Sequence, residues 1–150
     1  MTIPFVKWPG EKCAALSALM RRMPDQVDTY WEPFVGGGSL FFAIADRIRQ
    51  AHLSDVNEEL IIAYQVVRDK VDALIDALKG HEKRHHDKIG YYLEVRESEP
   101  EDEVQIAARL IYLNKTSRNG IYRLDAQGKF NVPEGASTAV NNFYICDAEG

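Results

Sequence analysis

The sequence has few of the residues that mark several common classes of protein. Only two of its 150 residues are cysteine, Cys13 and Cys146, which is too few for a disulfide framework, and no metal-ligand spacing surrounds them. No apolar run reaches the length of a membrane span, and the first residues lack the pattern of a signal peptide. These absences predict a soluble cytoplasmic protein.

Positive charge is also scarce overall, but it is unevenly distributed. The chain has 18 Lys and Arg against 23 Asp and Glu, a net charge of −5 that by itself argues against a nucleic-acid partner. Residues 104–133, however, hold five basic residues against the single acid Asp125, a local net charge of +4. The five are Arg109, Lys115, Arg118, Arg123 and Lys129. Because of this basic segment, we still predict that the chain contacts nucleic acid.

The first half of the chain has the pattern of an α/β sheet. With 45% hydrophobic and 27% charged residues, the chain can bury a core of the size of one domain or of one piece of a larger one. The predicted elements are a helix at 12–23, a strand at 29–32, a glycine turn at 36–38, a helix at 40–50 capped by Ser39, a strand at 52–54, and a helix capped by Asn57 whose pattern continues to Leu78. Strands alternating with helices favour the α/β class.

The second half is more polar. Residues 80–103 are highly charged, and the mostly acidic stretch 97–103 is predicted to be an exposed loop. A helix is predicted at 104–115, and two turn signals, Asn119-Gly120 and Ala126-Gln127-Gly128, predict a hairpin. The chain thus begins like an α/β nucleotide-binding fold, which is then interrupted by an insertion of helix and hairpin. This insertion carries the positive charge.

The glycine turn and Asp55 form the first candidate ligand site. Glycines after a buried strand let the backbone approach a ligand, and Asp55 follows Gly36 by 19 residues, at the end of the second predicted strand. An acid at about this spacing accepts hydrogen bonds from ribose hydroxyls in nucleotide folds. The turn has neither the Gly-x-Gly-x-x-Gly nor the phosphate-loop pattern, which favours an adenosine-type ligand without a pyrophosphate. A plain turn with a helix-capping Asp is the alternative.

Three histidines, His81, His85 and His86, lie in the charged region. His81 and His85 would share a helix face, but no third ligand of suitable type stands out. We therefore expect solvated helix histidines and no metal site.

Six segments, in order, carry a resemblance to a known family. They are Phe-Val-Lys-Trp-Pro-Gly-Glu-Lys at 5–12, Glu-Pro-Phe-Val-Gly-Gly-Gly-Ser-Leu-Phe at 32–41, Ser-Asp-Val-Asn at 54–57, Tyr-Leu-Asn-Lys at 112–115, Asn-Gly-Ile-Tyr-Arg at 119–123 and Gly-Lys-Phe-Asn-Val-Pro at 128–133. Over nearly the whole chain, they resemble the Dam-type DNA adenine-N6 methyltransferases. The resemblance implies a Rossmann-like S-adenosylmethionine-dependent methyltransferase fold of the α/β class, incomplete here, with a helical and β-hairpin target-recognition insertion.

The resemblance also implies roles for particular residues. S-adenosylmethionine is the expected cofactor, with Trp8 packing on it, Lys12 reaching its carboxylate and Asp55 holding the ribose hydroxyls. The implied cofactor-binding residues are Trp8, Lys12, Pro33, Phe34, Gly36, Gly38 and Asp55. The implied contacts to double-stranded DNA are Lys7, Lys115, Arg118, Asn119, Ile121 and Arg123, with Arg123 on a guanine of a target such as 5′-GATC.

One motif that the resemblance implies is absent. The family activates the poorly nucleophilic adenine amine with Asp-Pro-Pro-Tyr, whereas the six prolines here include no adjacent pair. No catalytic residue is therefore predicted within the chain. It is expected to be the N-terminal portion of a methyltransferase, as a truncated product, a fragment, or one subunit of a split enzyme with a complementary C-terminal catalytic polypeptide.

The predicted organisation is a cofactor-binding part at 1–70, a target-recognition part at 71–135 and a return toward the catalytic part at 136–150. The leading function is methyl transfer from S-adenosylmethionine to an extruded adenine. A non-catalytic module that binds DNA or a partner is the alternative, and an NAD-binding oxidoreductase is disfavoured by the missing third glycine. Restriction-modification, phage protection and housekeeping methylation in a bacterial cytoplasm all remain open as biological roles.

Overall fold

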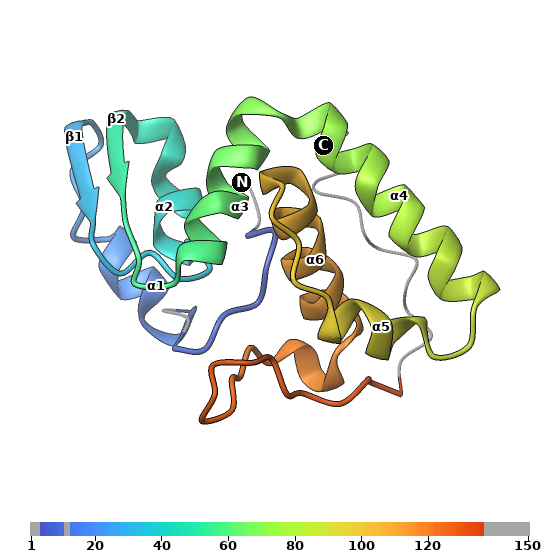
Figure 1. The fold of residues 1–150 in the computed structure, drawn as a ribbon. Helices are drawn as coiled ribbons and strands as arrows, with labels where there is room; N and C mark the ends of the chain where they lie inside the picture. Colours follow the sequence, from blue (N-terminus) through green and yellow to red (C-terminus); the bar gives the residue numbers. More distant parts are fainter. Residues whose placement is uncertain (1–3, 11–12, 137–150) are drawn as a thin grey trace. The chain divides into compact units, whose positions relative to one another are not determined.

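The computed structural model describes residues 4–10 and 13–136, and the chain divides between Asn57 and Glu58 into two compact units (Figure 1). The first unit contains a small parallel sheet, and the second is built mostly of helices. The fold is therefore mixed α and β, as the sequence predicts. In the part of the chain that the structure describes, no helix is both long and apolar enough to cross a membrane.

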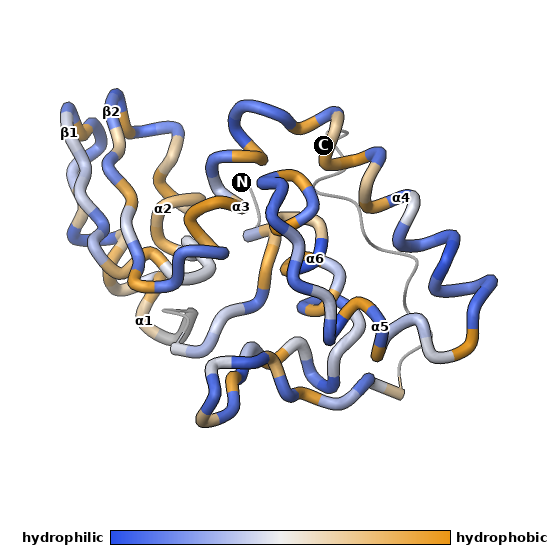
Figure 2. Tube along the Cα trace, viewed as in Figure 1, coloured by the Kyte–Doolittle hydropathy of each residue, from blue (hydrophilic) through white to orange (hydrophobic). Residues whose placement is uncertain are grey.

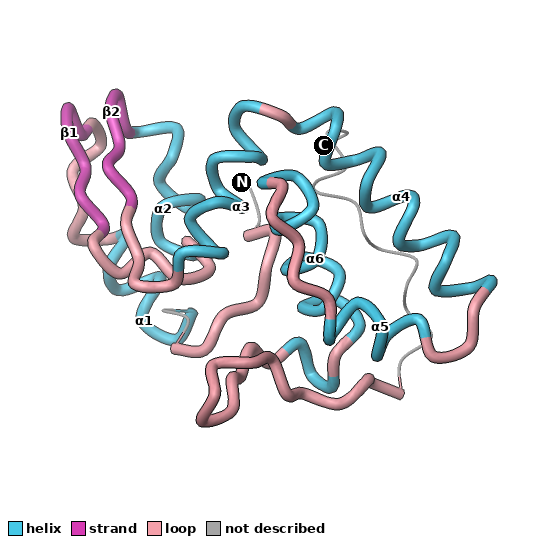
Figure 3. Tube along the Cα trace, in the orientation of Figure 1, coloured by secondary structure: helices cyan, strands magenta, loops and turns pink. Residues whose placement is uncertain are grey.

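Two parallel strands form the sheet of the first unit. β1 (Val27–Glu32) and β2 (Ile48–Leu53) pair over their whole length, with Glu32 opposite Leu53 at the carboxyl ends. Figure 3 shows the two strands side by side. Parallel pairing requires a crossover connection, and it brings both carboxyl ends to the same edge of the sheet.

The crossover contains α2 (Ser39–Ile44) and a 3-10 turn, η1 (Ala45–Arg47). A further helix, α1 (Cys13–Met20), precedes β1 and packs against α2. The buried apolar residues of the unit are Phe5, Val6, Val35 and Ile44. This core holds the segment before α1 and the glycine turn in place.

The predicted helix at 40–50 is wrong at both ends. Its cap is Gly38 in a left-handed conformation (φ 75°), and Ser39 lies buried in the first turn without capping it. The helix also ends early, because Ile48 and Gln50 pair with β1. Cross-strand pairing outweighs the helical spacing of these residues, so β2 is longer than the predicted strand at 52–54.

The second unit is organised around one buried helix, α6 (Glu103–Thr116), close to the predicted helix at 104–115. Every residue from 107 to 114 is buried. The helices α3 (Glu58–Asp69), α4 (Val71–Asp87) and α5 (Tyr91–Glu97) all pack against it (Figure 1). Asp102 caps its amino end by accepting a 3.1 Å hydrogen bond from the Gln105 amide.

The charged region 80–103 contains more helix than predicted. α4 continues through it to Asp87 and α5 follows, although Figure 2 shows how polar this part of α4 is. Each helix buries a narrow face, formed by Leu74, Leu78 and His81 of α4 and by Tyr91, Tyr92 and Val95 of α5, and the last four of these residues lie within the charged sequence. Only 98–102, between α5 and α6, remains of the predicted loop.

After α6 the chain forms a hairpin-like loop, residues 117–134. It is closed by two isolated antiparallel bridges, Ser117 with Glu134 and Leu124 with Phe130. The predicted turn at Asn119-Gly120 is present, with both residues at positive φ, but it belongs to a 3-10 turn, η2 (Arg118–Gly120), next to α6. The predicted turn at 126–128 forms the tip.

The prediction that the α4 histidines are solvated is wrong for His81 and His85. His81 is buried, its Nδ1 lies 2.8 Å from the Tyr91 hydroxyl, and its ring stacks on Tyr112 with centroids 4.9 Å apart. His85 is half-buried, with Nδ1 2.7 Å from the Tyr112 hydroxyl, whereas His86 is exposed. Among the described residues, no three His, Cys, Asp or Glu side chains come together as a metal site.

Burial, with a smaller effect of the nearby Arg84, lowers the pKa of His81 to about 4 from its ordinary 6.5. The folded state therefore disfavours the charged imidazole. The stability that the neutral imidazole of His81 gives the folded state is fully present above pH 6.5 and is lost as the pH falls from 6.5 toward 4. Between pH 7 and pH 4.5, the free energy of unfolding of the wild-type chain should therefore fall by about 2–3 kcal/mol more than that of His81→Gln.

Urea denaturation at the two pH values measures this difference. His86→Gln, which changes an exposed histidine of the same helix, should keep the wild-type pH dependence. Equal pH dependence in His81→Gln and wild type would contradict the buried neutral imidazole.

Candidate functional site

The carboxyl ends of β1 and β2 are tied together by the turns that follow them. The Ser54 amide donates to the Glu32 carbonyl at 3.0 Å, and the Val35 amide donates to the Ser54 carbonyl at 3.0 Å. The Ser54 hydroxyl also donates to the Pro33 carbonyl at 3.2 Å. The glycine turn and Asp55 are therefore neighbours, at the sheet edge where open α/β folds bind their ligands.

Asp55 is the centre of this edge. Its Oδ2 accepts a 3.0 Å hydrogen bond from the Gly36 amide, and its Oδ1 accepts another of 3.0 Å from the Asn57 amide. The side chain is half-buried. A carboxylate has about four lone-pair positions, so these two bonds fix its orientation and leave acceptor capacity for a ligand hydroxyl. The structural and ligand-binding interpretations of Asp55 are thus compatible.

Gly36 joins the turn to the segment before α1. Its φ is +53°, and a Cβ at this position would lie 3.0 Å from Cδ1 of Trp8. A Cβ contact of 3.0 Å is tighter than nine in ten real ones, and L side chains rarely adopt this positive φ, so the close approach of Trp8 favours glycine here. The half-buried indole, the turn and Asp55 therefore form one small arrangement, the carboxyl-edge cluster of Trp8, Gly36 and Asp55.

The other predicted cofactor residues lie around this cluster or cannot be placed. Pro33 and Phe34 are exposed at the start of the turn, with 76% of Phe34 accessible, and Gly38 is buried at the start of α2. Lys12 lies outside the described residues. Sequence reasoning overlooked Glu32, a carboxylate only 5% exposed at the end of β1.

Glu32 accepts a 2.9 Å hydrogen bond from the Tyr30 hydroxyl. Burial and this bond raise the pKa of Tyr30 well above its ordinary value. The period of a strand puts residues 30 and 32 on one face and Trp31, which is exposed and stacked on His52, on the other. That alternation was the signal that could have identified Glu32.

The tip of the hairpin-like loop is held by Asp125. Its Oδ1 accepts hydrogen bonds of 2.9 Å from the Gln127 and Lys129 amides, while its own amide donates to the Lys129 carbonyl at 2.8 Å. Gly128 has a φ of +79°, which favours glycine. The tip is therefore an ordered turn, although its residues are exposed.

The base of the loop is anchored to α6. The buried Asn114 side chain donates to the Gly120 carbonyl at 3.2 Å, and the Arg118 amide donates to the Pro133 carbonyl at 3.0 Å. The Gly135 amide donates to the Thr116 carbonyl at 2.8 Å. These bonds fix the segment that carries the predicted DNA contacts.

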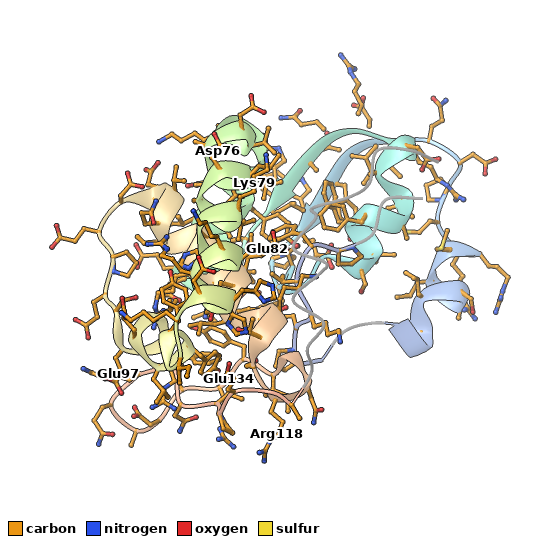
Figure 4. All side chains as sticks on the ribbon, turned by 90° about the vertical axis from the view of Figure 1, so that its right-hand side faces the viewer. Asp76, Lys79, Glu82, Glu97, Arg118 and Glu134 are labelled. Atoms are coloured by element: carbon orange, nitrogen blue, oxygen red, sulfur yellow. The ribbon has the colours of Figure 1, made fainter. Side chains whose placement is uncertain are left out.

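The predicted DNA contacts differ in their exposure. Arg118, Asn119, Ile121 and Arg123 are exposed residues of the hairpin-like loop, and Lys115 is half-buried in the last turn of α6. Figure 4 shows Arg118 extending outward. Lys7 is exposed in the other unit.

Two of the five basic residues in 104–133 form ion pairs with acids from outside that segment. Arg109 is buried, lies 3.5 Å from a Glu59 oxygen, and donates to the carbonyls of Val95 and Arg96. Lys129 lies 3.2 Å from a Glu99 oxygen. Both line a pocket of about 680 Å³ between the α5–α6 loop and the hairpin tip. Arg118 and Arg123 are exposed, as is Lys129.

Comparison with known proteins identifies the family of the chain. The family model of the D12 class N6 adenine-specific DNA methyltransferases matches residues 8–146. The chain belongs to this family. The family resemblance carried by the sequence motifs is thereby confirmed.

Three relatives show how much of such a protein the chain covers. It is 37% identical to the type II methyltransferase M1.LlaDCHI of Lactococcus lactis subsp. cremoris, in a match that covers 88% of this chain and 47% of that protein. It is 38% identical over 139 residues to the type II methyltransferase M.CviBI of Paramecium bursaria Chlorella virus NC1A, 92% of this chain and 52% of that protein. It is 29% identical to the DNA adenine methylase of Escherichia coli K12, in a match that covers 96% of this chain and 57% of that protein. The chain thus spans about half the length of the curated relatives it matches.

Members of this methyltransferase family act on adenine in DNA and use S-adenosylmethionine as the methyl donor. The carboxyl-edge cluster and the hairpin-like loop both lie within the matched residues.

Proposed function

We propose that this chain supplies cofactor-binding and DNA-reading residues for the transfer of a methyl group from S-adenosylmethionine to the N6 atom of adenine in duplex DNA. The observation that carries the proposal is the carboxyl-edge cluster, in which Gly36 lies against Trp8 and donates to Asp55. A ligand with a ribose, a flat aromatic part and a separate cationic part suits this combination of carboxylate and indole.

The residues present fit S-adenosylmethionine. Asp55 keeps acceptor capacity for ribose hydroxyls while its two backbone donors hold it still. The Trp8 indole suits the aromatic and sulfonium-bearing parts, and the exposed Phe34 adds apolar surface at the start of the turn. Lys12 is assigned to the cofactor's carboxylate from the family motif alone. When bound, the cofactor supplies the methyl group.

We propose that residues 71–135 recognise the DNA target, with the hairpin-like loop as the reading element. Arg123 presents a planar guanidinium that matches O6 and N7 of guanine, and Ile121 offers apolar contact to a thymine methyl. Asn119 and Lys115 are assigned to the DNA backbone and Lys7 to the outer base pair. Arg118, where the loop leaves α6, is assigned to a DNA contact of no specified kind. The 5′-GATC target remains a proposal of the family resemblance.

Within these 150 residues, nothing matches the Asp-Pro-Pro-Tyr motif that accepts hydrogen bonds from the adenine amine. Its absence favours a second candidate function, binding of DNA or of a catalytic partner without chemistry by this chain. A polypeptide that carries the motif would complete the enzyme.

We expect the 150-residue chain alone to transfer no methyl group, because the Asp-Pro-Pro-Tyr motif that raises the nucleophilicity of the amine is absent from its sequence. Incorporation of tritium from labelled S-adenosylmethionine into adenine-containing duplex measures this. Addition of a polypeptide carrying Asp-Pro-Pro-Tyr should restore incorporation if the chain supplies the cofactor and DNA contacts.

The variant Asp55→Ala identifies the source of any signal. Incorporation by the isolated wild-type chain that Asp55→Ala abolishes would contradict the prediction. Incorporation that is equal in both would indicate a contaminating methyltransferase and would count against neither site.

A further inference from the structure

Arg123 is held across the hairpin-like loop by one residue, Asn131. The Arg123 Nε donates to Oδ1 of Asn131 at 2.8 Å, and its Nη2 makes a longer contact of 3.5 Å to the Asn131 carbonyl oxygen. In the opposite direction, the Asn131 amide donates to the Arg123 carbonyl at 3.1 Å. An exposed arginine otherwise samples many rotamers, so these contacts restrict it before any DNA is bound.

The contacts also select which edge of the guanidinium is used. A guanidinium has five N–H donors arranged in a rigid plane. Asn131 occupies the edge formed by Nε and Nη2, and the described residues place no acceptor on the edge formed by Nη1 and Nη2. That second edge can make a bidentate contact to the two major-groove acceptors of guanine, O6 and N7.

Asn131 is itself firmly placed. It lies between two buried residues, Phe130 and Val132, and it is half-buried. The Val132 carbonyl accepts a 2.9 Å hydrogen bond from the Tyr92 hydroxyl of α5, and the Phe130 ring contacts Tyr122 with centroids 5.7 Å apart. The loop segment that fixes Arg123 is therefore anchored to α5.

We propose that Asn131 is a positioning residue for base discrimination: it orients the Arg123 guanidinium so that its terminal edge meets one guanine. This rests on the proposed DNA-reading function of the loop. Ordering a rotamer-rich side chain at an interface costs about 0.5–1.5 kcal/mol, and an arginine oriented in advance avoids that cost. Loss of Asn131 should therefore reduce discrimination by about 2–10-fold at the base pair that Arg123 reads.

Binding of the full chain to a panel of duplexes, each varied at one position, tests the proposal by fluorescence anisotropy. The variants are Arg123→Ala, Asn131→Ala, the double variant and Asn131→Asp. Asn131→Ala should lose discrimination at the same base pair as Arg123→Ala, and the double variant should equal Arg123→Ala. Asn131→Asp retains an acceptor for Nε, so it should restore discrimination even though its added negative charge weakens binding to every duplex alike.

A spectroscopic signal of the free chain provides a second readout. The Arg123 Nε–H resonance should be protected from exchange with water in the wild-type chain and in Asn131→Asp, and lost in Asn131→Ala. Retention of the protected resonance in Asn131→Ala would overturn the assignment of Asn131 as the residue that holds Arg123.

The outcomes separate the two levels of the proposal. Loss of discrimination in Asn131→Ala that adds to that of Arg123→Ala, or that falls at another base pair, would overturn positioning and make Asn131 a direct reader. Discrimination lost in Arg123→Ala but unchanged in Asn131→Ala would also overturn it. A wild-type chain that binds every duplex equally would overturn the DNA-reading function, and the role of Asn131 with it.

Discussion

Asp55→Ala should weaken binding of S-adenosylmethionine by about 10–100-fold, since a hydrogen bond to a charged acceptor contributes about 1.5–3 kcal/mol. The substitution removes the proposed acceptor for the ribose hydroxyls. It also leaves the amides of Gly36 and Asn57 without the oxygens to which they donate. Both effects act on the same sheet edge. Isothermal titration calorimetry of the chain with S-adenosylmethionine measures the change.

Two further variants separate the ligand contact from general damage. Asp28→Ala removes a carboxylate near the amino end of β1, where it pairs with Arg49 across the surface at 3.1 Å, and it should bind the cofactor like the wild type. Asp55→Asn keeps one oxygen acceptor and should fall between the wild type and Asp55→Ala. Equal affinity of wild type and Asp55→Ala would remove the proposed ribose contact.

The second large effect concerns the hairpin-like loop. Arg123→Ala should lose about 1–3 kcal/mol of discrimination at a single base pair, because a bidentate contact to guanine is lost. Lys115→Ala should instead weaken binding to all sequences alike and reduce the salt dependence by about one charge, as expected for a phosphate contact. The two signatures differ in kind.

A competition panel at two salt concentrations distinguishes them. Lys79→Ala serves as the control, because it removes a positive charge from an exposed position of α4, at the opposite end of the unit from Arg118 in Figure 4. It should change neither discrimination nor the salt slope appreciably. If Arg123→Ala weakens every sequence equally, the arginine positions the DNA backbone, and the base reader lies elsewhere.

The carboxyl-edge cluster was largely predictable from the sequence. Its signals are local: glycines after a short strand, and an acid 19 residues later at the end of the next strand. Parallel strands bring such residues to one edge without further information. The contact between Trp8 and Gly36 could not be read from spacing, because it depends on how the segment before α1 packs on the turn.

The errors arose where tertiary contacts override a local pattern. Ile48 and Gln50 continue a helical spacing but belong to β2, since β1 offers them backbone partners. His81 lies in a charged stretch, yet α4 presents it to Tyr91 of α5 and Tyr112 of α6, so it is buried. Neither outcome follows from a window of neighbouring residues.

The pairing of Arg123 with Asn131 stands between these cases. A turn at 126–128 with Leu124 opposite Phe130 places residue 123 opposite residue 131, so the register of the loop contains the pair. The sequence pattern did not predict that the loop closes without regular strands. That closure depends on Asp125 at the tip and on bonds to α6 at the base.

The central claim is that the carboxyl-edge cluster holds S-adenosylmethionine. The most direct measurement is an amide and indole N–H nuclear magnetic resonance titration of the chain with the cofactor. The Gly36 and Asn57 amides, which donate to Asp55, and the Trp8 indole should show the largest shifts, and Asp55→Ala should suppress them. Saturable shifts confined to other residues, or none at millimolar cofactor, would contradict the account.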